Sequence, residues 1–288
     1  MKTGRLFIGF ICSILLCGVL MGKKTEADTP AKTVDVMFLH DTHSHLKEFA
    51  TVENGESKVM GGFARIKTLI NEQLTKNPDT LLLDAGDFSM GTLIQVVYES
   101  EASELRMLGD LGMDITTLGN HEFDYGARGM ANMMTNAVNS GDKLPTMVVC
   151  NIDWNTMNAS PDMMTPDVQA LAVAMERLQV KNYVVLNKNG VDIAVTGVFG
   201  IDALACVPNC PILFTDPIEA FSTVTMYSTS LGTVVCLTMT NWQTPQCEPS
   251  ESPVSVVVAG RPASITTVCP VAGIVSVFLL PQVEQRKR

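Results

Sequence analysis

Short apolar runs alternate with amphipathic stretches along the first two thirds of the chain. Runs rich in Val, Ile and Leu predict strands, and apolar positions that repeat every three or four residues predict helices between them. The expected strands are Val34–Leu39, Thr80–Leu83, Ile115–Leu118 and Thr146–Ile152, and the expected helices are Gly62–Leu74, Ala102–Leu111 and Gly129–Val138. Strands that alternate with helices predict an α/β fold with a mixed sheet.

A hairpin is expected further along. The runs Asn182–Leu186 and Asp192–Val198 are separated by Asn187-Lys188-Asn189-Gly190, a strong turn sequence. In the helix expected before it, Met130, Met133 and Met134 share one face. Such a stripe is more typical of an adaptable core than of a ligand pocket.

The N-terminus has the pattern of an export signal. Lys2 and Arg5 precede an apolar run from Leu6 to Met21, which is short for a membrane span. Three interpretations stay open: a cleaved signal, lipid attachment at Cys17, or an uncleaved anchor. We therefore expect residues 1–24 to be a signal peptide or anchor, residues 25–33 to be a linker, and the protein to be exported to the cell surface, the periplasm or the extracellular space. The second and third interpretations would attach it to the membrane through its N-terminus.

The composition changes after Ala220. Residues 221–288 contain neither Asp nor His and show no clear helical period. This tail is either a small β-rich appendage or a segment that a shifted reading frame produced and that stays disordered. The sequence thus predicts a main domain at 34–220 and an unmatched segment at 221–288.

The acidic charge limits the class of partner. A formal net charge of −10 argues against a nucleic acid polymer, because phosphate backbones recruit Lys and Arg. An acidic protein can still act on a small phosphate ester when bound metal ions supply the positive charge. Oligomeric state is left open by the sequence.

Metal-ligand residue types follow three of the expected strands. Asp41 and His43 are second neighbours on an extended segment and point the same way. Asp87 ends the next run, and Asn120 and His121 follow the third. Ligands of α/β sheets collect at the carboxyl ends of strands, so these side chains should converge. Carboxylate, imidazole and amide oxygen suit Zn²⁺, Mn²⁺ or Mg²⁺.

Neighbouring polar residues have simpler interpretations. His40 and His45 either lie near the site or serve packing in the loop, and we favour the second. Asp84 is expected to support its loop, and Glu122 to act as a structural hydrogen-bonding residue rather than as a base.

The motifs HDTHSHL, LLLDAGDF and GNHEFDYG together resemble those of the calcineurin-like metallophosphoesterases, and among them the exported bacterial 5′-nucleotidases. The supporting sequences GGFAR, CNI and FTDPIEA extend the resemblance over residues 34–220. The resemblance implies a four-layer αββα sandwich that holds two metal ions between loops at the strand ends.

The resemblance also implies a role for each residue. Asp41 and His43 would hold the first metal ion, Asp87 would bridge both ions, and Asn120 would hold the second. Two cations a few ångströms apart repel each other, so a bridging carboxylate is expected.

Asn120 and His121 would contact the substrate phosphate. His121 would not bind metal but would stabilise the transferring phosphoryl group or protonate the leaving oxygen. Asp124 would orient His121.

The chain departs from the family after these motifs. It contains four histidines, none of them after His121, whereas the family supplies further histidine ligands later. The sandwich is therefore expected to be incomplete, with one metal ion held tightly.

We expect metal-dependent hydrolysis of phosphate monoesters, particularly nucleotides, at an impaired rate. The alternative is a catalytically inactive exported protein that binds metal or another ligand; a third interpretation is a remnant that never folds stably.

Overall fold

The computed structural model describes residues 33–229 and five later strand segments, at 235–240, 257–258, 261–262, 265–268 and 276–278. The predicted export segment at 1–24 and all but the last residue of the predicted linker at 25–33 lie outside the described residues. Within the described part of the chain, no helix has both the length and the apolar character that a membrane span requires.

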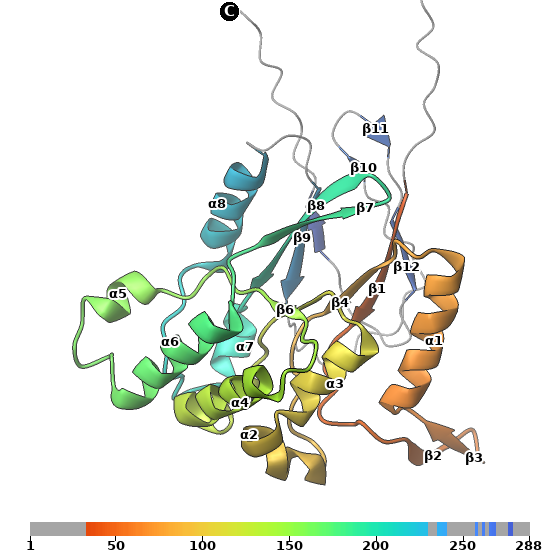
Figure 1. Cartoon of the computed structure of the whole chain (residues 1–288), viewed down its shortest axis with the longest axis horizontal. Helices are drawn as coiled ribbons and strands as arrows, with labels where there is room; N and C mark the ends of the chain where they lie inside the picture. Colours follow the sequence, from red (N-terminus) through yellow and green to blue (C-terminus); the bar gives the residue numbers. More distant parts are fainter. Residues whose placement is uncertain are drawn as a thin grey trace, which may run out of the picture. The chain divides into compact units, whose positions relative to one another are not determined.

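Two sheets form the centre of the molecule (Figure 1). In the first sheet the order is β12-β1-β4-β5-β6, and every neighbouring pair is parallel. Its strands are β1 (Val34–Leu39), β4 (Leu81–Asp84), β5 (Ile115–Thr116), β6 (Thr146–Met147) and β12 (Ile265–Val268).

The second sheet has the order β13-β9-β8-β7. Its strands are β7 (Val184–Lys188), β8 (Val191–Val198), β9 (Val235–Thr240) and β13 (Ser276–Phe278). β7 and β8 form the predicted antiparallel hairpin, whereas β8 and β9 are parallel.

Helices and short hairpins fill the connections. The helices are α1 (Phe63–Lys76), α2 (Tyr98–Glu101), α3 (Ser103–Leu111), α4 (Gly126–Ser140), α5 (Trp154–Asn158), α6 (Pro166–Leu178), α7 (Ile201–Ala205) and α8 (Pro217–Thr229), with 3-10 turns η1 (Leu93–Val97) and η2 (His121–Phe123). Two small hairpins pair β2 (Phe49–Glu53) with β3 (Glu56–Met60) and β10 (Val257–Val258) with β11 (Arg261–Pro262).

Strand β1 shows how the layers form. Its residues Val34, Val36 and Phe38 enter an apolar core that also contains Ile193 and Val195 of β8, so the two sheets pack face to face. The alternate residues of β1 point to the opposite side of the sheet, because side chains alternate along a strand.

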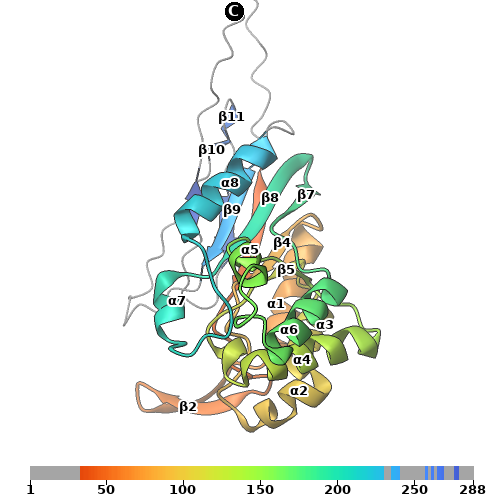
Figure 2. The same ribbon diagram turned by 90° about the vertical axis from the view of Figure 1, so that its left-hand side faces the viewer.

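On that opposite side lies the larger core. Met37 and Leu39 join the methionine stripe of α4, all of which is buried, so the stripe is core as expected. Helix α8 packs against β8 and β9 of the second sheet, as Figures 1 and 2 both show. These layers confirm the predicted α/β sandwich.

The predicted division at Ala220 falls inside a helix. α8 runs without interruption from Pro217 to Thr229. Beyond it, β9 pairs with β8 and β12 pairs with β1. Residues after Ala220 therefore contribute strands to both sheets.

Candidate metal centre

Three loops meet where β1, β4 and β5 end. The three strands are parallel neighbours, so their carboxyl ends lie at one edge of the sheet. Backbone hydrogen bonds join the first two loops: Asp41 N–H donates to Gly86 O at 3.1 Å, His43 N–H to Asp87 O at 3.1 Å, and Ser44 N–H to Phe88 O at 2.8 Å. The loops are held together before any ligand is considered.

Left-handed backbone is concentrated in these loops. Asp41, His43 and Asp87 have φ angles of 49°, 45° and 53°. A non-glycine residue in this region costs about 1–2 kcal/mol, and such strain persists where the surrounding structure imposes it, often at functional sites. The strain indicates that the loop geometry serves something other than stability.

Two glycines allow the close approach of the second and third loops. A Cβ atom on Gly119 would lie 2.2 Å from Oδ1 of Asp87, and one on Gly86 would lie 2.6 Å from the nitrogen of Gly119. The Asp87 carboxylate can therefore contact the third loop only because both positions lack a side chain.

A compact group of ligand atoms results. One ligand atom each from His43, Asp87 and His121 lie within 4.8 Å of one another. The two imidazole rings meet edge to face with centroids 5.0 Å apart, and the backbone N–H of His121 donates to Asp87 Oδ1 at 2.9 Å. Asp87 is fully buried, whereas both histidines are partly exposed.

Asp41 lies at the edge of this group. Its Oδ1 is 3.8 Å from His43 Nε2, is buried, and has no hydrogen-bond partner. Its other oxygen pairs with His40. Burial raises the pKa of Asp41, but the hydrogen bond and charge of His40, the contact with the Asp87 carboxyl group and the charge of His43 outweigh that effect and bring the pKa below its ordinary value.

These donors fit a divalent cation. Asp41 and Asp87 are close enough to interact directly, so a proton or a cation between them removes their repulsion. Oxygen and imidazole donors together suit Zn²⁺, Mn²⁺ or a similar ion. The unpaired Asp41 Oδ1 is the buried acceptor that such an ion would satisfy.

Asn120 and Asp124 stand on either side of His121. Asn120 is almost fully buried. It lies between Gly119 and His121, and the backbones of both of these residues approach Asp87 closely. Asp124 Oδ2 lies 2.9 Å from His121 Nδ1, the pairing expected from the sequence. The loop segments that carry the six predicted site residues thus meet in one region of the structure. The individual role of each residue stays a prediction.

Glu122 holds the second and third loops together through hydrogen bonds. Its carboxylate accepts hydrogen bonds from the backbone of Asp87 (3.0 Å), Ser89 (3.1 Å) and Gly119 (2.6 Å), and from the Ser89 hydroxyl (2.9 Å). Burial, reinforced by the charge of Asp87, raises the pKa of Glu122 to about 8, although the bonds from Gly119 and Ser89 act in the opposite direction. This agrees with the hydrogen-bonding role expected for Glu122.

Asp84, His40 and His45 are the other polar residues for which the sequence predicted a role near the site. Asp84 is buried and accepts from Thr116 Oγ1 at 2.6 Å and Gly86 N–H at 3.2 Å, as expected of a loop support. His40 pairs with Asp41, whereas the His45 ring packs on Phe49 with centroids 5.8 Å apart. Of these two histidines, only His40 contacts a predicted ligand in the contacts that the structure gives.

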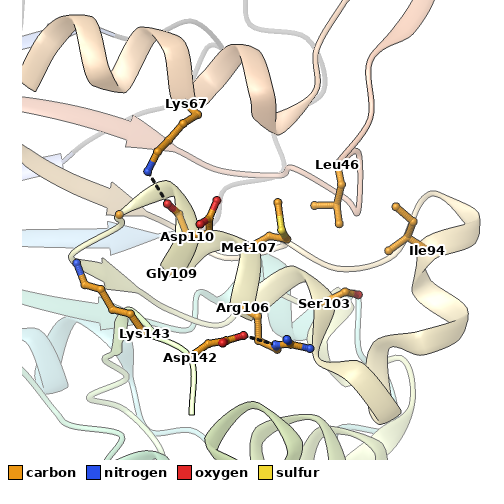
Figure 3. Close-up of a pocket in the computed structure, with 11 residues that line it drawn as sticks. Leu46, Lys67, Ile94, Ser103, Arg106, Met107, Gly109, Asp110, Asp142 and Lys143 are labelled. Carbon is orange, nitrogen blue, oxygen red and sulfur yellow. Dashed lines mark hydrogen bonds and ion pairs between the residues drawn. The ribbon is translucent and has the colours of Figure 1, made fainter. Parts of the chain in front are cut away.

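A separate cavity of about 750 Å³ lies between α1 and α3 (Figure 3). Lys67, Arg106 and Lys143 line it together with the acids Asp110 and Asp142, and Arg106 pairs with Asp142 at 2.6 Å. None of the predicted site residues lines this cavity. The candidate site therefore lies at the strand ends and not in this cavity.

Comparison with known proteins shows which family part of this chain resembles. Residues 35–168 match the model of the calcineurin-like phosphoesterase family. The chain is 34% identical over 107 residues to the 5′-nucleotidase of Bos taurus (36% of this chain, 18% of that protein), and 31% identical over 103 residues to a probable 5′-nucleotidase of Treponema pallidum (34% and 17%). It therefore spans less than a fifth of the length of these relatives.

Solved structures share the fold. The 5′-nucleotidase precursor of Thermus thermophilus superposes with a TM-score of 0.53 at 23% identity, over 71% of this chain and 36% of that one. A calcineurin-like phosphoesterase of Bacillus subtilis superposes with a TM-score of 0.51 at 18% identity, over 75% and 64%. These two structures show the shared fold, and residues 35–168, which contain the motifs at the three strand ends, are similar to the calcineurin-like phosphoesterase family.

Proposed function

We propose that this protein is a metal-dependent hydrolase of small phosphate monoesters, and that nucleotides are its substrates. The observation that carries the proposal is the convergence of His43, Asp87 and His121 at the carboxyl edge of a parallel sheet. The 5′-nucleotidases that share its motifs support the choice of nucleotides over other esters.

Each site residue has a proposed task. Asp41, His43, Asp87 and Asn120 hold the divalent cation, which when bound supplies the positive charge that offsets the charge of the phosphoryl group. Because the chain is acidic, this charge must come from the ion and not from Lys or Arg.

His121 performs the proton chemistry. Its Nδ1 faces the Asp124 carboxylate, so the carboxylate fixes the ring orientation and favours a proton on Nδ1. The other ring nitrogen then faces the substrate, where it contacts the phosphoryl group or protonates the leaving oxygen. Asn120 contributes its side-chain amide to the same phosphate.

The proposed stoichiometry is one tightly bound ion. The first position has Asp41, His43 and Asp87, whereas the second has Asp87 and Asn120 and, in these 288 residues, no further histidine beyond His121. Turnover by this polypeptide is therefore proposed to be low. Export, with attachment through the N-terminal apolar run, is part of the same proposal and rests on residues 1–24.

Calorimetric titration with Mn²⁺ and Zn²⁺, combined with phosphate release from AMP and from p-nitrophenyl phosphate, tests this function. We expect one tight site and slow, metal-dependent release that Asp87→Asn abolishes. Asp79→Asn is the matched control, because Asp79 is an exposed carboxylate that precedes β4 and so lies at the end of that strand opposite Asp87.

Release that continues after chelation, or that survives Asp87→Asn, contradicts the proposal. Metal binding without any phosphate release favours the alternative, an exported binding protein on the same scaffold. Two tight sites with rapid turnover contradict the proposed impairment.

A further inference from the structure

A buried carboxylate lies beneath the loop that carries His43. Glu104 and Ser44 are both fully buried although 60 residues separate them in the chain. The Ser44 hydroxyl donates to Glu104 Oε1 at 2.6 Å, and the Ser103 hydroxyl donates to Oε2 at 2.8 Å. Both carboxylate oxygens of Glu104 are thus satisfied by hydroxyl groups.

This arrangement is costly as packing alone. Removing a carboxyl group from water is unfavourable unless strong hydrogen bonds replace the water, and an apolar side chain would fill the same space without that cost. Short hydrogen bonds to a carboxylate are, however, directional and about twice as strong as neutral ones. Glu104 is therefore better suited to fixing the position of its partners than to stabilising the core.

Ser44 is the partner that needs fixing. Its φ angle is 55°, and the neighbouring His43 has a φ of 45°. Its N–H donates to Phe88 O at 2.8 Å, and its carbonyl oxygen accepts from the Thr92 hydroxyl at 2.7 Å. With the bond to Glu104, every polar group of Ser44 is held. Two successive non-glycine residues stay left-handed only under such constraint.

We infer that Glu104 is a positioning residue for the metal centre: through Ser44 it holds the loop in the conformation that presents the His43 imidazole to Asp87 and His121. The inference rests on the proposed metal site and adds to it a residue from a different element, the first turn of α3.

The second hydroxyl on Glu104 provides an internal control. Ser103 lies on α3 and lines the cavity shown in Figure 3, and it is not part of the loop that carries His43. Removing it takes one hydrogen bond from the same carboxylate but leaves the bond to Ser44 intact. A general packing role of Glu104 would make the two hydroxyls equivalent, whereas a positioning role makes only Ser44 matter for metal binding.

The test is the affinity for Mn²⁺, measured by titration of the full chain with electron paramagnetic resonance detection of free ion. We expect Ser44→Ala and Glu104→Ala each to weaken binding about tenfold, the lower end of what loss of an outer partner of a ligand costs. The double variant should be no weaker than either single one, because both remove the same bond. Ser103→Ala should bind as the wild type does.

Glu104→Gln provides the rescue. Its amide oxygen can accept from Ser44 while its NH₂ donates to the Ser103 oxygen, so we expect affinity within about threefold of wild type. If Glu104→Ala does not fold, Ser44→Ala, a smaller change, decides the matter.

If Ser44→Ala binds Mn²⁺ with wild-type affinity, the inference is overturned and the proposed function still stands. The same holds if Ser103→Ala loses as much Mn²⁺ affinity as Ser44→Ala does. Failure of the wild-type chain to bind Mn²⁺ overturns the metal centre itself, and the positioning role with it.

Discussion

His121 is the residue on which two interpretations of the site differ. The family resemblance makes it a group that acts on the phosphate, whereas its ring lies close enough to His43 and Asp87 to share a cation with them. Its pairing with Asp124 is compatible with either role, because ligating and proton-transferring histidines are both oriented by carboxylates.

Replacing His121 with Ala separates the two roles. If His121 acts on the phosphate, we expect phosphate release to fall about 10²-fold or more while Mn²⁺ affinity stays near that of wild type. Asp124→Asn should cause a smaller fall in the same direction. A tenfold loss of Mn²⁺ affinity in His121→Ala would instead make His121 a ligand.

Asp84 gives a prediction about pH at the same scale. Burial raises its pKa from 3.8 to about 7, against the lowering effect of the hydrogen bonds from Thr116 and Gly86. Between these values the folded chain keeps a proton that the unfolded chain releases. The free energy of unfolding that Asp84 contributes is therefore greatest below pH 4 and falls as the pH rises through 7, by at most ~1.4 kcal/mol per pH unit.

Asp84→Asn should remove this decline, because an amide does not titrate in this pH range. The hydrogen bond from Thr116 is kept, since the amide oxygen can still accept it. Urea unfolding at pH 5, 6 and 7, with chelator present, measures the difference. The free energy of unfolding of the variant should rise relative to that of the wild type as the pH rises. The contribution of Glu122 is present in both proteins and cancels in the difference. Parallel stability curves would show that the folded chain holds no such proton.

At the scale of elements, local signals identified the helices α1, α3 and α4 and the hairpin of β7 and β8. Helix α6 was not expected, although its start is well marked: the Thr165 side chain accepts from Val168 N–H at 3.3 Å, and Pro166 occupies the first turn. It also missed the pair β2 and β3, whose exposed residues lack the apolar alternation that identifies a half-buried strand. The expected strands at Ile115–Leu118 and Thr146–Ile152 are each shorter in the structure. After β5 the chain leaves the sheet to form a site loop, whereas after β6 it pairs with Lys181 and Gly197 instead.

The cap of α6 can be tested directly. Thr165→Ala should lower the free energy of unfolding by ~1 kcal/mol, because the N–H of Val168 loses its acceptor. Thr165→Ser keeps the hydroxyl and should behave as wild type. Chemical denaturation measures both, and an equal loss in the two variants would show that the cap is not the cause. Mn²⁺ affinity should be unchanged in either.

At the scale of the whole molecule, the residues after Ala220 matter through strand pairing. β9 pairs with β8 in parallel over six positions, from Ile193 with Val235 to Val198 with Thr240. A tail that a shifted frame produced would have no reason to complete a sheet, so the pairing bears on which interpretation of residues 221–288 holds.

Truncation after Thr229 tests this pairing. The truncation removes β9 from one edge of β8 and β12 from one edge of β1, so we expect the Tm to fall by at least about 4 °C, equivalent to ~1–2 kcal/mol in a domain of this size. Deletion of residues 1–30, which lie outside the expected main domain, is the control and should leave the Tm unchanged. An unchanged Tm after truncation would favour a tail that does not pair.

The sequence by itself determined the α/β class, the strand ends at which ligand-type residues stand, and the resemblance carried by Asp41, His43, Asp87 and the Asn120–His121 pair. These are local properties, since periodicity and short motifs report which face is buried and where a strand ends. Tertiary structure alone decided that His121 lies beside His43, that Gly119 leaves room only for the Asp87 carboxylate, and that Glu104 lies beneath Ser44. The physical reason is that such contacts join residues tens of positions apart, and no local pattern specifies which distant partner will meet a given side chain.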